Sequence, residues 1–322
     1  MYKEKSVAVV VPAYNEELLI GKTLSTMPDF VDKIFVVEDG SSDRTREIVQ
    51  GCQEGDPRIS LLVHEQNQGL GQTLVDGYLA SREAEMDITA VMAGDAQMDP
   101  DDLPAVLDPI AENWADYVKG NRLLRDEVVF SMPRYRYIGN SILTLLTKFA
   151  TGYWHIIDPQ CGYTAISHRA LATIPIEEMI KGYGYNAHIL NMLNLNSFKV
   201  CDVGIAPVYG EEKSGIKLKS YIPRVAKLLT HLFARRMVHK YMVREFNPLI
   251  FFYLFSFVNT ILIGAPFMVR FFYLYHKEGI APATTLIILT FSMSMGILSF
   301  FFAMWMDMED NRRLIAAEPL RP

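Results

Sequence analysis

The stretch Val7-Ala-Val-Val-Val-Pro-Ala-Tyr-Asn-Glu16 decides the fold, because a continuous apolar run gives way at once to a polar turn. Three further β-branched runs follow within the first hundred residues, at Ile34–Val37, Ile59–Val63 and Ile88–Met92. Segments with helical spacing separate these runs, at Glu16–Met27, Thr45–Cys52 and Gly69–Ala84. This alternation is typical of a mainly parallel sheet covered by helices on both faces. We therefore predict an α/β domain.

Polar residues stand directly after three of these runs. In a parallel sheet the ligand binds beyond the carboxyl ends of the strands. We therefore expect three segments to line one site: Pro12-Ala-Tyr-Asn-Glu16, Glu38-Asp-Gly-Ser-Ser-Asp43 and Ala93-Gly-Asp-Ala-Gln97.

Charge divides the 322-residue chain into three regions. Residues 1–210 hold 17 Lys and Arg against 29 Asp and Glu, residues 211–246 hold 9 against 3, and residues 247–322 hold 5 against 5. An acidic head, a basic collar and an apolar tail predict a soluble domain on a membrane stem. No nucleic-acid partner is expected.

The apolar tail contains two uncharged stretches, Pro248–Val269 and Thr284–Trp305. Each has about 22 residues, enough to cross a hydrocarbon core of roughly 30 Å. They predict a transmembrane hairpin joined by Arg270–Ala283. A buried helix pair in a soluble protein is the alternative, which the length and uniform apolarity of both stretches disfavour.

The flanks of this hairpin predict its orientation. Lys and Arg are concentrated before the first stretch and at Arg312 and Arg313 after the second, whereas the connection holds only Arg270 and Lys277. Positive flanks stay in the cytoplasm. Three scattered cysteines and an N-terminus without a signal-peptide core agree with a cytoplasmic head.

Basic and apolar residues alternate in Ser220–Val243, which predicts a helix lying in the lipid headgroup region. A helix packed on the head is the alternative. Ile138–Tyr153 is a second candidate for an interfacial helix. The expected organisation is thus a head over 1–217, a juxtamembrane region over 218–246, a hairpin over 247–306 and a cytoplasmic tail over 307–322.

Three motifs in order, Val11–Glu16, Val37–Asp43 and Gly94–Pro100, resemble glycosyltransferase family 2. Within that family they are similar to the polyprenyl-phosphate sugar synthases, such as the dolichol-phosphate mannose and glucose synthases. The resemblance covers residues 6–217 and implies a nucleotide-binding domain of the GT-A type. It also implies a nucleotide-sugar donor, a polyprenyl or dolichyl phosphate acceptor, contact with the bilayer, and association of hairpins into a homo-oligomer.

On the donor side, the resemblance implies that one set of side chains binds the nucleotide: Pro12, Tyr14, Glu16, Glu38, Asp39 and Lys213. Lys213, with Lys217 as second choice, would supply a cation to the leaving diphosphate. Asp95 and Gln97 would hold Mg²⁺ or Mn²⁺, for which oxygen ligands are suited. Ala93 stands where the family has another Asp, so metal binding before the nucleotide arrives should be weak. Asp99 should instead cap the next helix.

On the acceptor side, the resemblance implies that Arg122, Arg136 and Asn140 bind the lipid phosphate. Guanidinium groups bind phosphate through two parallel hydrogen bonds, and Arg134 could replace Arg136. Asp158, in Asp158-Pro-Gln-Cys-Gly162, would be a catalytic carboxylate, as would Asp95. It would act as a base or orient the acceptor, since a phosphate monoester is already largely ionised at neutral pH. His64 and His188 lie in no cluster and are expected in core or surface roles.

The predicted reaction is an inverting transfer, with a UDP-sugar preferred as donor and GDP-mannose second. Lys181–His188 would line the sugar pocket. One alternative is transfer to another lipid hydroxyl or to a polysaccharide, but no Arg-Trp pair of the processive synthases is present. An alternative of another class is an inactive nucleotide-binding scaffold, which the loss at Ala93 would permit.

Overall fold

The computed structural model describes residues 1–124, 134–182, 184–206, 218–280 and 282–317. The chain forms two compact units. The first comprises Met1–Phe233 and Leu314–Pro322, and the second comprises Ala234–Arg313.

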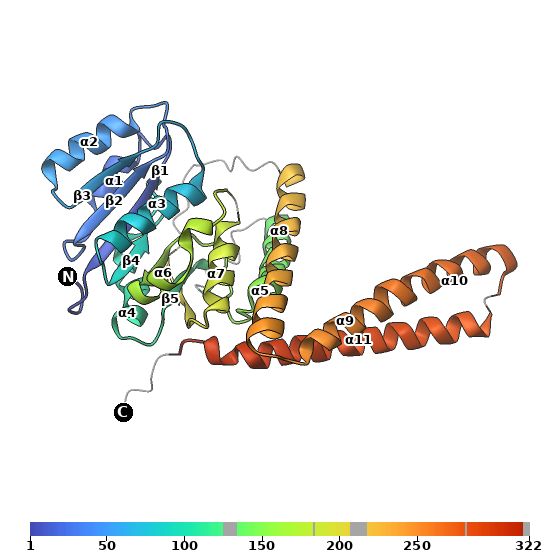
Figure 1. Cartoon of the computed structure of the whole chain (residues 1–322). Helices are drawn as coiled ribbons and strands as arrows, with labels where there is room; N and C mark the ends of the chain where they lie inside the picture. Colours follow the sequence, from blue (N-terminus) through green and yellow to red (C-terminus); the bar gives the residue numbers. More distant parts are fainter. Residues whose placement is uncertain (125–133, 183, 207–217, 281, 318–322) are drawn as a thin grey trace. The chain divides into compact units, whose positions relative to one another are not determined.

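A seven-stranded sheet, ordered β3-β2-β1-β4-β6-β5-β7, runs through the first unit (Figure 1). β6 is antiparallel to β4 and β5, and the other pairings are parallel. The predicted α/β fold with a mainly parallel sheet is therefore confirmed. The strands are β1 Val7–Ala13, β2 Lys33–Glu38, β3 Ile59–Val63, β4 Ile88–Val91, β5 Tyr117–Asn121, β6 Thr164–Ser167 and β7 Val200–Gly204.

Helices cover both faces of this sheet. The α-helices of the unit are α1 Ile20–Ser25, α2 Thr45–Gly55, α3 Leu70–Glu83, α4 Leu103–Ala111, α5 Arg134–Thr151, α6 His168–Thr173, α7 Tyr185–Leu195 and α8 Leu218–Val238, whose last turn enters the second unit. Short 3₁₀ turns lie at η1 Pro100–Asp102, η2 Arg122–Leu124 and η4 Ile176–Glu178.

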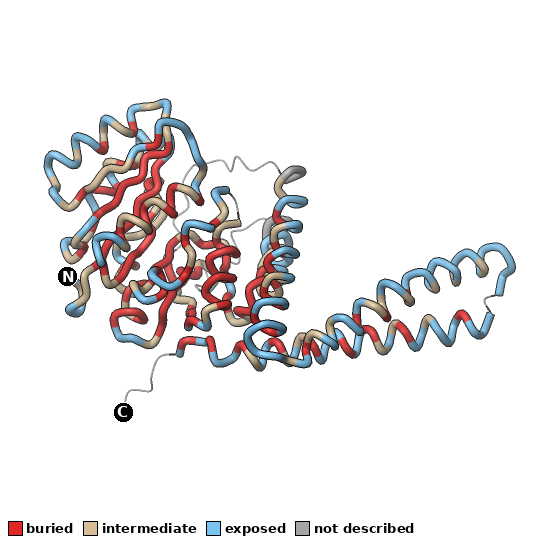
Figure 2. Tube along the Cα trace, in the orientation of Figure 1, coloured by how far each residue is buried: buried red, intermediate tan, exposed pale blue. Residues whose placement is uncertain are grey.

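The alternation of side chains along β1 explains why two helical layers are needed. Val7, Val9 and Val11 pack in the core under α1, α2 and α4, whereas Ala8 and Val10 pack in the core under α3, α6 and α7. Successive side chains of a strand point to opposite faces, and β1 is buried throughout (Figure 2). A continuous apolar run is thus the signature of a strand buried on both sides.

A third, smaller core joins α8 to α5 and α7. Val225, Leu229 and Leu232, at helical spacing on α8, pack with Ala150 and Ala187. The basic side chains Arg224 and Lys227 stay exposed on the same helix. The predicted helices at Ser220–Val243 and Ile138–Tyr153 are therefore present, and α8 packs on the head. Their contact with lipid remains a prediction.

Residues 314–316, within the predicted tail, pack against the sheet of the first unit. Ile315 pairs with Val200 at the edge strand β7, and the backbone N–H of Ala316 donates to the Val200 carbonyl. Leu314 and Ala316 are buried in the two sheet cores. Their apolar side chains and the unpaired edge of β7 give this segment partners that hydropathy alone could not predict.

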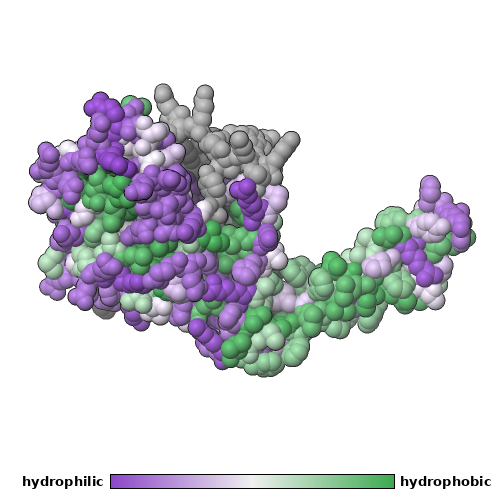
Figure 3. All heavy atoms as spheres, turned by 45° about the horizontal axis from the view of Figure 1, so that its top comes forward, coloured by the Kyte–Doolittle hydropathy of each residue, from purple (hydrophilic) through white to green (hydrophobic). Residues whose placement is uncertain are grey.

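The second unit is a long helical hairpin. Its elements are the π-helical turn η5 His239–Arg244, α9 Leu249–Phe257, the π-helical turn η6 Val258–Gly264, α10 Ala265–Glu278 and α11 Ala283–Asn311. Leu249–Glu278 and Ala283–Leu314 are long and apolar enough to cross a membrane, by length and composition. Apolar residues cover much of the hairpin's visible face, and polar residues gather at its tip (Figure 3).

The hairpin turn is shorter than hydropathy predicted. The connection expected over Arg270–Ala283 is largely helical, because α10 continues to Glu278 and ends at Gly279 in the left-handed conformation. Hydropathy measures the apolar thickness of a span, whereas backbone hydrogen bonds decide where its helix ends.

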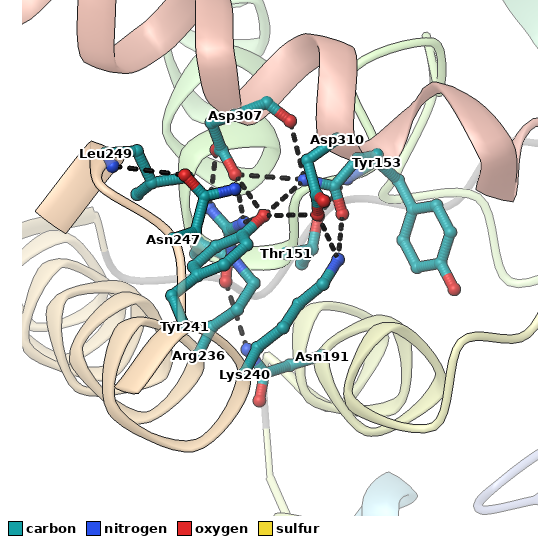
Figure 4. Close-up of polar contacts among 12 residues, drawn as sticks. Thr151, Tyr153, Asn191, Arg236, Lys240, Tyr241, Asn247, Leu249, Asp307 and Asp310 are labelled. Atoms are coloured by element: carbon teal, nitrogen blue, oxygen red, sulfur yellow. Dashed lines mark hydrogen bonds and ion pairs between the residues drawn. The ribbon is translucent and has the colours of Figure 1, made fainter. Parts of the chain in front are cut away.

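A buried polar cluster closes the base of the hairpin (Figure 4). Two guanidinium nitrogens of Arg236 donate to the two oxygens of Asp307, at 2.6 and 2.8 Å, and neither side chain is exposed. The Tyr241 hydroxyl donates to Asp307 at 2.7 Å. Lys240 donates to Asn311 at 2.7 Å. The cluster ties the start of the unit to the end of α11.

We predict that Asp307→Leu destabilises the protein by about 3–5 kcal/mol, because it leaves a buried guanidinium without its counter-ion. Thermal unfolding in detergent would measure the loss. The double variant Arg236→Met/Asp307→Leu should recover most of it, and the exposed control Glu309→Ala should change little. A parent-like Asp307→Leu would show that the ion pair contributes nothing to the hairpin.

Candidate active site

The three predicted polar segments meet at one edge of the sheet. β2, β1 and β4 are parallel neighbours, so their carboxyl ends lie side by side. The backbone N–H of Asp39 donates to the Ala13 carbonyl at 2.9 Å, and that of Gly94 donates to the Pro12 carbonyl at 3.1 Å. The side chain of Asn15 accepts from the Ser42 N–H at 2.9 Å. Backbone and side-chain bonds thus join all three segments.

The first segment presents one large side chain to solvent. Tyr14 is 47% exposed, Pro12 is buried and Glu16 is half-buried. The Glu16 N–H donates to the Thr45 hydroxyl at 2.8 Å, which holds the turn against α2. The exposed ring of Tyr14 suits a surface that a nucleotide could cover.

Both carboxylates at the end of β2 are buried. Glu38 accepts hydrogen bonds from the Ser41 N–H and from Arg46, whose Nε lies 3.0 Å away. Asp39 accepts from the N–H groups of Gln68 and Gly69 at 2.8 and 2.9 Å, and is 3% exposed. Glu38 therefore shapes the turn after β2, and Asp39 fixes the loop before α3. Nucleotide binding by either residue remains a prediction.

His64 is buried, in agreement with the predicted core or surface role, and it contacts the candidate site residue Asp39. Its Nδ1 lies 2.7 Å from Asp39, and its Nε2 lies 2.9 Å from Asp76 on α3. His64 directly follows β3, so the strand-end rule would have found it had it been applied to this fourth strand.

The predicted metal ligands lie on the turn after β4. Asp95 is half-buried, and burial raises the pKa of its carboxyl. Its Oδ1 accepts from the Gln97 N–H at 3.1 Å. A partly desolvated carboxylate gains from a nearby cation, so Asp95 fits a divalent metal. Asp99 accepts from the Asp101 N–H at the start of η1, which confirms its capping role.

Asp95 and Gln97 are few protein ligands for a metal ion. Within the described ranges, no group of three or more His, Cys, Asp and Glu side chains could hold a metal. Ala93 removes one carboxylate from the turn. A metal bound here would need oxygens from the donor diphosphate, in keeping with the preference of Mg²⁺ for phosphate and few protein ligands.

Arg122, which directly follows β5, forms a pair with Asp158. Arg122 Nε lies 2.8 Å and Nη2 3.3 Å from the two Asp158 oxygens. Asp158 is 6% exposed, whereas the Arg122 side chain is 42% exposed. The structure thus joins the predicted catalytic carboxylate to a predicted phosphate ligand. The Arg122 guanidinium is therefore held in place by Asp158 and still reaches solvent.

The other predicted acceptor residues are less fully described. Arg136 and Asn140 lie on α5, where Asn140 is exposed. The side chain of Arg136 and all of Lys213 and Lys217 lie outside the described residues.

Lys119 is a further residue that sequence reasoning missed. It is fully buried on β5, and its Nζ donates to the Cys161 carbonyl at 2.7 Å and to Asn186 at 3.0 Å. Burial lowers the pKa of its ammonium group. Lys119 connects the segment that carries Asp158 to the predicted sugar-pocket segment. The sequence contains a signal for this role, because Lys119 is a charged residue within the apolar run Tyr117-Val-Lys119.

Comparisons with known proteins identify the family of the chain. The model for glycosyl transferase family 2 matches residues 8–174. A UDP-N-acetylglucosamine–dolichyl-phosphate N-acetylglucosaminyltransferase of Methanococcus voltae is 28% identical over 221 residues, which are 65% of this chain and 88% of the relative. An undecaprenyl-phosphate mannosyltransferase of Micrococcus luteus is 27% identical over 182 residues, 56% of this chain and 74% of the relative.

A solved structure has the same fold. It is a mannosyltransferase from Pyrobaculum calidifontis in complex with GDP-Man and Mn²⁺, with a TM-score of 0.52 and 18% identity. The match covers 94% of this chain and 87% of that one.

We predict that His64→Gln weakens binding of the nucleoside diphosphate about tenfold, because a charged hydrogen bond contributes roughly 1.5–3 kcal/mol. Calorimetric titration with UDP or GDP would measure it, with the exposed His231→Gln on α8 as control. Equal affinities in parent and His64→Gln would remove His64 from the nucleotide site.

Proposed function

Because the chain belongs to glycosyltransferase family 2, we propose that it transfers a sugar from a nucleotide-sugar to a polyprenyl phosphate. The observation that carries the proposal is the pairing of buried Asp158 with the solvent-reaching Arg122, which directly follows β5 at the edge of the sheet where Asp95 follows β4. This arrangement provides separate places for a donor diphosphate and an acceptor phosphate. The names of the two relatives, which act on dolichyl and undecaprenyl phosphate, support this acceptor class.

A UDP-sugar is the preferred donor and GDP-mannose the second. The Methanococcus voltae relative, which uses UDP-N-acetylglucosamine by name, supports the first, and the Pyrobaculum calidifontis mannosyltransferase supports the second. Glu38 and Asp39 hold the two loops around the nucleotide, while Tyr14 covers it. Asn186, held by Lys119, would contact the sugar.

The reaction is a single displacement. An oxygen of the lipid phosphate attacks the anomeric carbon, the new carbon–oxygen bond forms, and the bond to the nucleoside diphosphate breaks with its electron pair leaving on the diphosphate. One attack inverts the anomeric carbon. Arg122 and Arg136 hold the acceptor phosphate, and Asp158 orients Arg122 without having to remove a proton.

Asp95 and Gln97 would hold Mg²⁺ or Mn²⁺, which supplies positive charge to the diphosphate. Lys213 adds a second positive charge on the leaving group. These charges stabilise the electron pair that develops there.

The two apolar helices would place this chemistry at a membrane. The head then lies on the cytoplasmic face, α8 and α5 lie at the headgroups, and Pro248–Val269 and Thr284–Trp305 cross the bilayer. A polyprenyl phosphate keeps its chain in the lipid, so an anchored enzyme meets it without extracting it. Hydroxyl acceptors are the alternative outcome of the assay below.

The proposal is tested with purified protein in detergent, polyprenyl phosphate, Mn²⁺ and a panel of radiolabelled nucleotide-sugars. We expect a lipid-linked sugar of inverted anomeric configuration from one donor. Transfer only to a hydroxyl acceptor, or binding of nucleotide without turnover of any donor, would contradict the proposal.

Asp95→Ala should lower turnover at least 100-fold while leaving the melting temperature unchanged, because it removes the carboxylate that faces the diphosphate. Asp101→Ala, on the exposed cap of η1, is the matched control. Near-normal rates in Asp95→Ala would remove the metal from the mechanism.

Arg136→Ala should raise KM for polyprenyl phosphate at least tenfold, because a guanidinium–phosphate pair is lost. Hydrolysis of the donor by water should change little. Arg82→Ala on α3 removes a guanidinium remote from the acceptor and serves as control. Equal losses of transfer and hydrolysis would show that Arg136 does not bind the acceptor.

A further inference from the structure

Asp202 on β7 is hydrogen-bonded to the residues that precede Arg122 and Asp158. It has no role in the reaction described so far. Its Oδ2 accepts a hydrogen bond from the Ile157 N–H at 2.6 Å and another from the Asn121 side-chain amide at 2.9 Å. Ile157 directly precedes Asp158, and Asn121 directly precedes Arg122. One carboxylate oxygen thus joins the two chain segments that carry the pair.

The Asn121 amide makes this connection rigid. While its Nδ2 donates to Asp202, its Oδ1 accepts from the Leu123 N–H at 2.9 Å. Asn121 is fully buried at the end of β5, and β5 is paired with β7 in parallel register. The positions of Arg122 and Asp158 therefore depend on a single acceptor on the neighbouring strand.

The second oxygen of Asp202 is available for a proton. In the part of the chain that the structure describes, Oδ1 is buried and makes no hydrogen bond. Burial is the main reason why the pKa of Asp202 is raised to about 6, and Asp158 adds to it. The Ile157 N–H, Lys119 and the Asn121 amide oppose the rise.

Other titratable groups also face Asp202. Lys148 on α5 and the adjacent Cys201 thiol both interact with its charge. Burial lowers the pKa of Lys148 and raises that of Cys201. Neither group is a candidate metal ligand, and none of them donates to the free oxygen in the described structure.

We propose that Asp202 is a positioning residue, which in its ionised form holds Arg122 and Asp158 in place for the acceptor phosphate and which releases that hold on protonation. The inference rests on the proposed function. Hydrogen bonds to an ionised acceptor are shorter and roughly twice as strong as those to a neutral one. A proton on Oδ1 leaves Oδ2 as a neutral carbonyl and weakens both bonds.

The ionised form works against folding, which separates this role from a structural one. Because the folded protein holds the pKa of Asp202 above the ordinary value of 3.8, ionisation at neutral pH disfavours the folded state. Asp202→Asn, which mimics the protonated side chain, should therefore melt no lower than the parent at pH 7.5. A loss of acceptor use in this variant then has no explanation in unfolding.

The test compares Asp202→Asn with the parent from pH 5 to pH 8. The ionisation of the acceptor phosphate, also near pH 6, is common to both proteins and cancels in the ratio. We expect kcat/KM for polyprenyl phosphate to be about tenfold lower in the variant at pH 8 and within about twofold of the parent at pH 5. KM for the nucleotide-sugar should stay unchanged at both.

Two further measurements test the same role of Asp202. Affinity for a short-chain polyprenyl phosphate, measured without donor, should give the same pH-dependent ratio. Asn121→Ala should raise KM for the acceptor and keep a pH-dependent KM whose midpoint lies at higher pH than in the parent, because Asp202 still titrates but loses a hydrogen bond that lowers its pKa. A ratio that stays constant from pH 5 to pH 8 overturns the inference while the parent's turnover still supports the proposed function. A parent that neither binds nor uses polyprenyl phosphate overturns both.

Discussion

The parallel pairing of β1 with both β2 and β4 is the constraint on which the site depends. It brings three strand ends, and the turns after them, to one edge of the sheet. The pairing requires β1 to be apolar on both faces, which in turn requires the helical layers on either side. The meeting of the turns after β1, β2 and β4 is therefore a consequence of how a doubly buried strand is covered.

The site is held by charges that the protein buries at a cost. Glu38, Asp39, Asp158 and Lys119 are almost fully inaccessible, yet each makes hydrogen bonds to backbone or side-chain partners. A buried charge is tolerated only when it is paired in this way. These bonds fix loops that no hydrophobic contact would hold, and a fixed site needs little rearrangement to stabilise developing charge.

The hairpin unit also pairs the charges that it buries. Its large apolar side chains, such as Phe251, Phe255 and Trp305, are exposed, whereas its charged residues Arg236 and Asp307 are buried together. An apolar exterior suits lipid, and a paired interior suits the base of a span, where an isolated charge would be costly.

The sequence by itself determined the α/β class, the segments that form the first four strands, the two apolar helices and the turns after β1, β2 and β4, because strand burial and strand-end position are local patterns. Only the tertiary structure showed that His64 bridges Asp39 and Asp76, that Asp202 ties Asn121 to Ile157, and that Leu314 and Ala316 return to the sheet. These contacts join residues distant in the chain. Such long-range contacts depend on which strands become neighbours and on how far each charged group is desolvated. Neither property can be predicted from a short stretch of sequence.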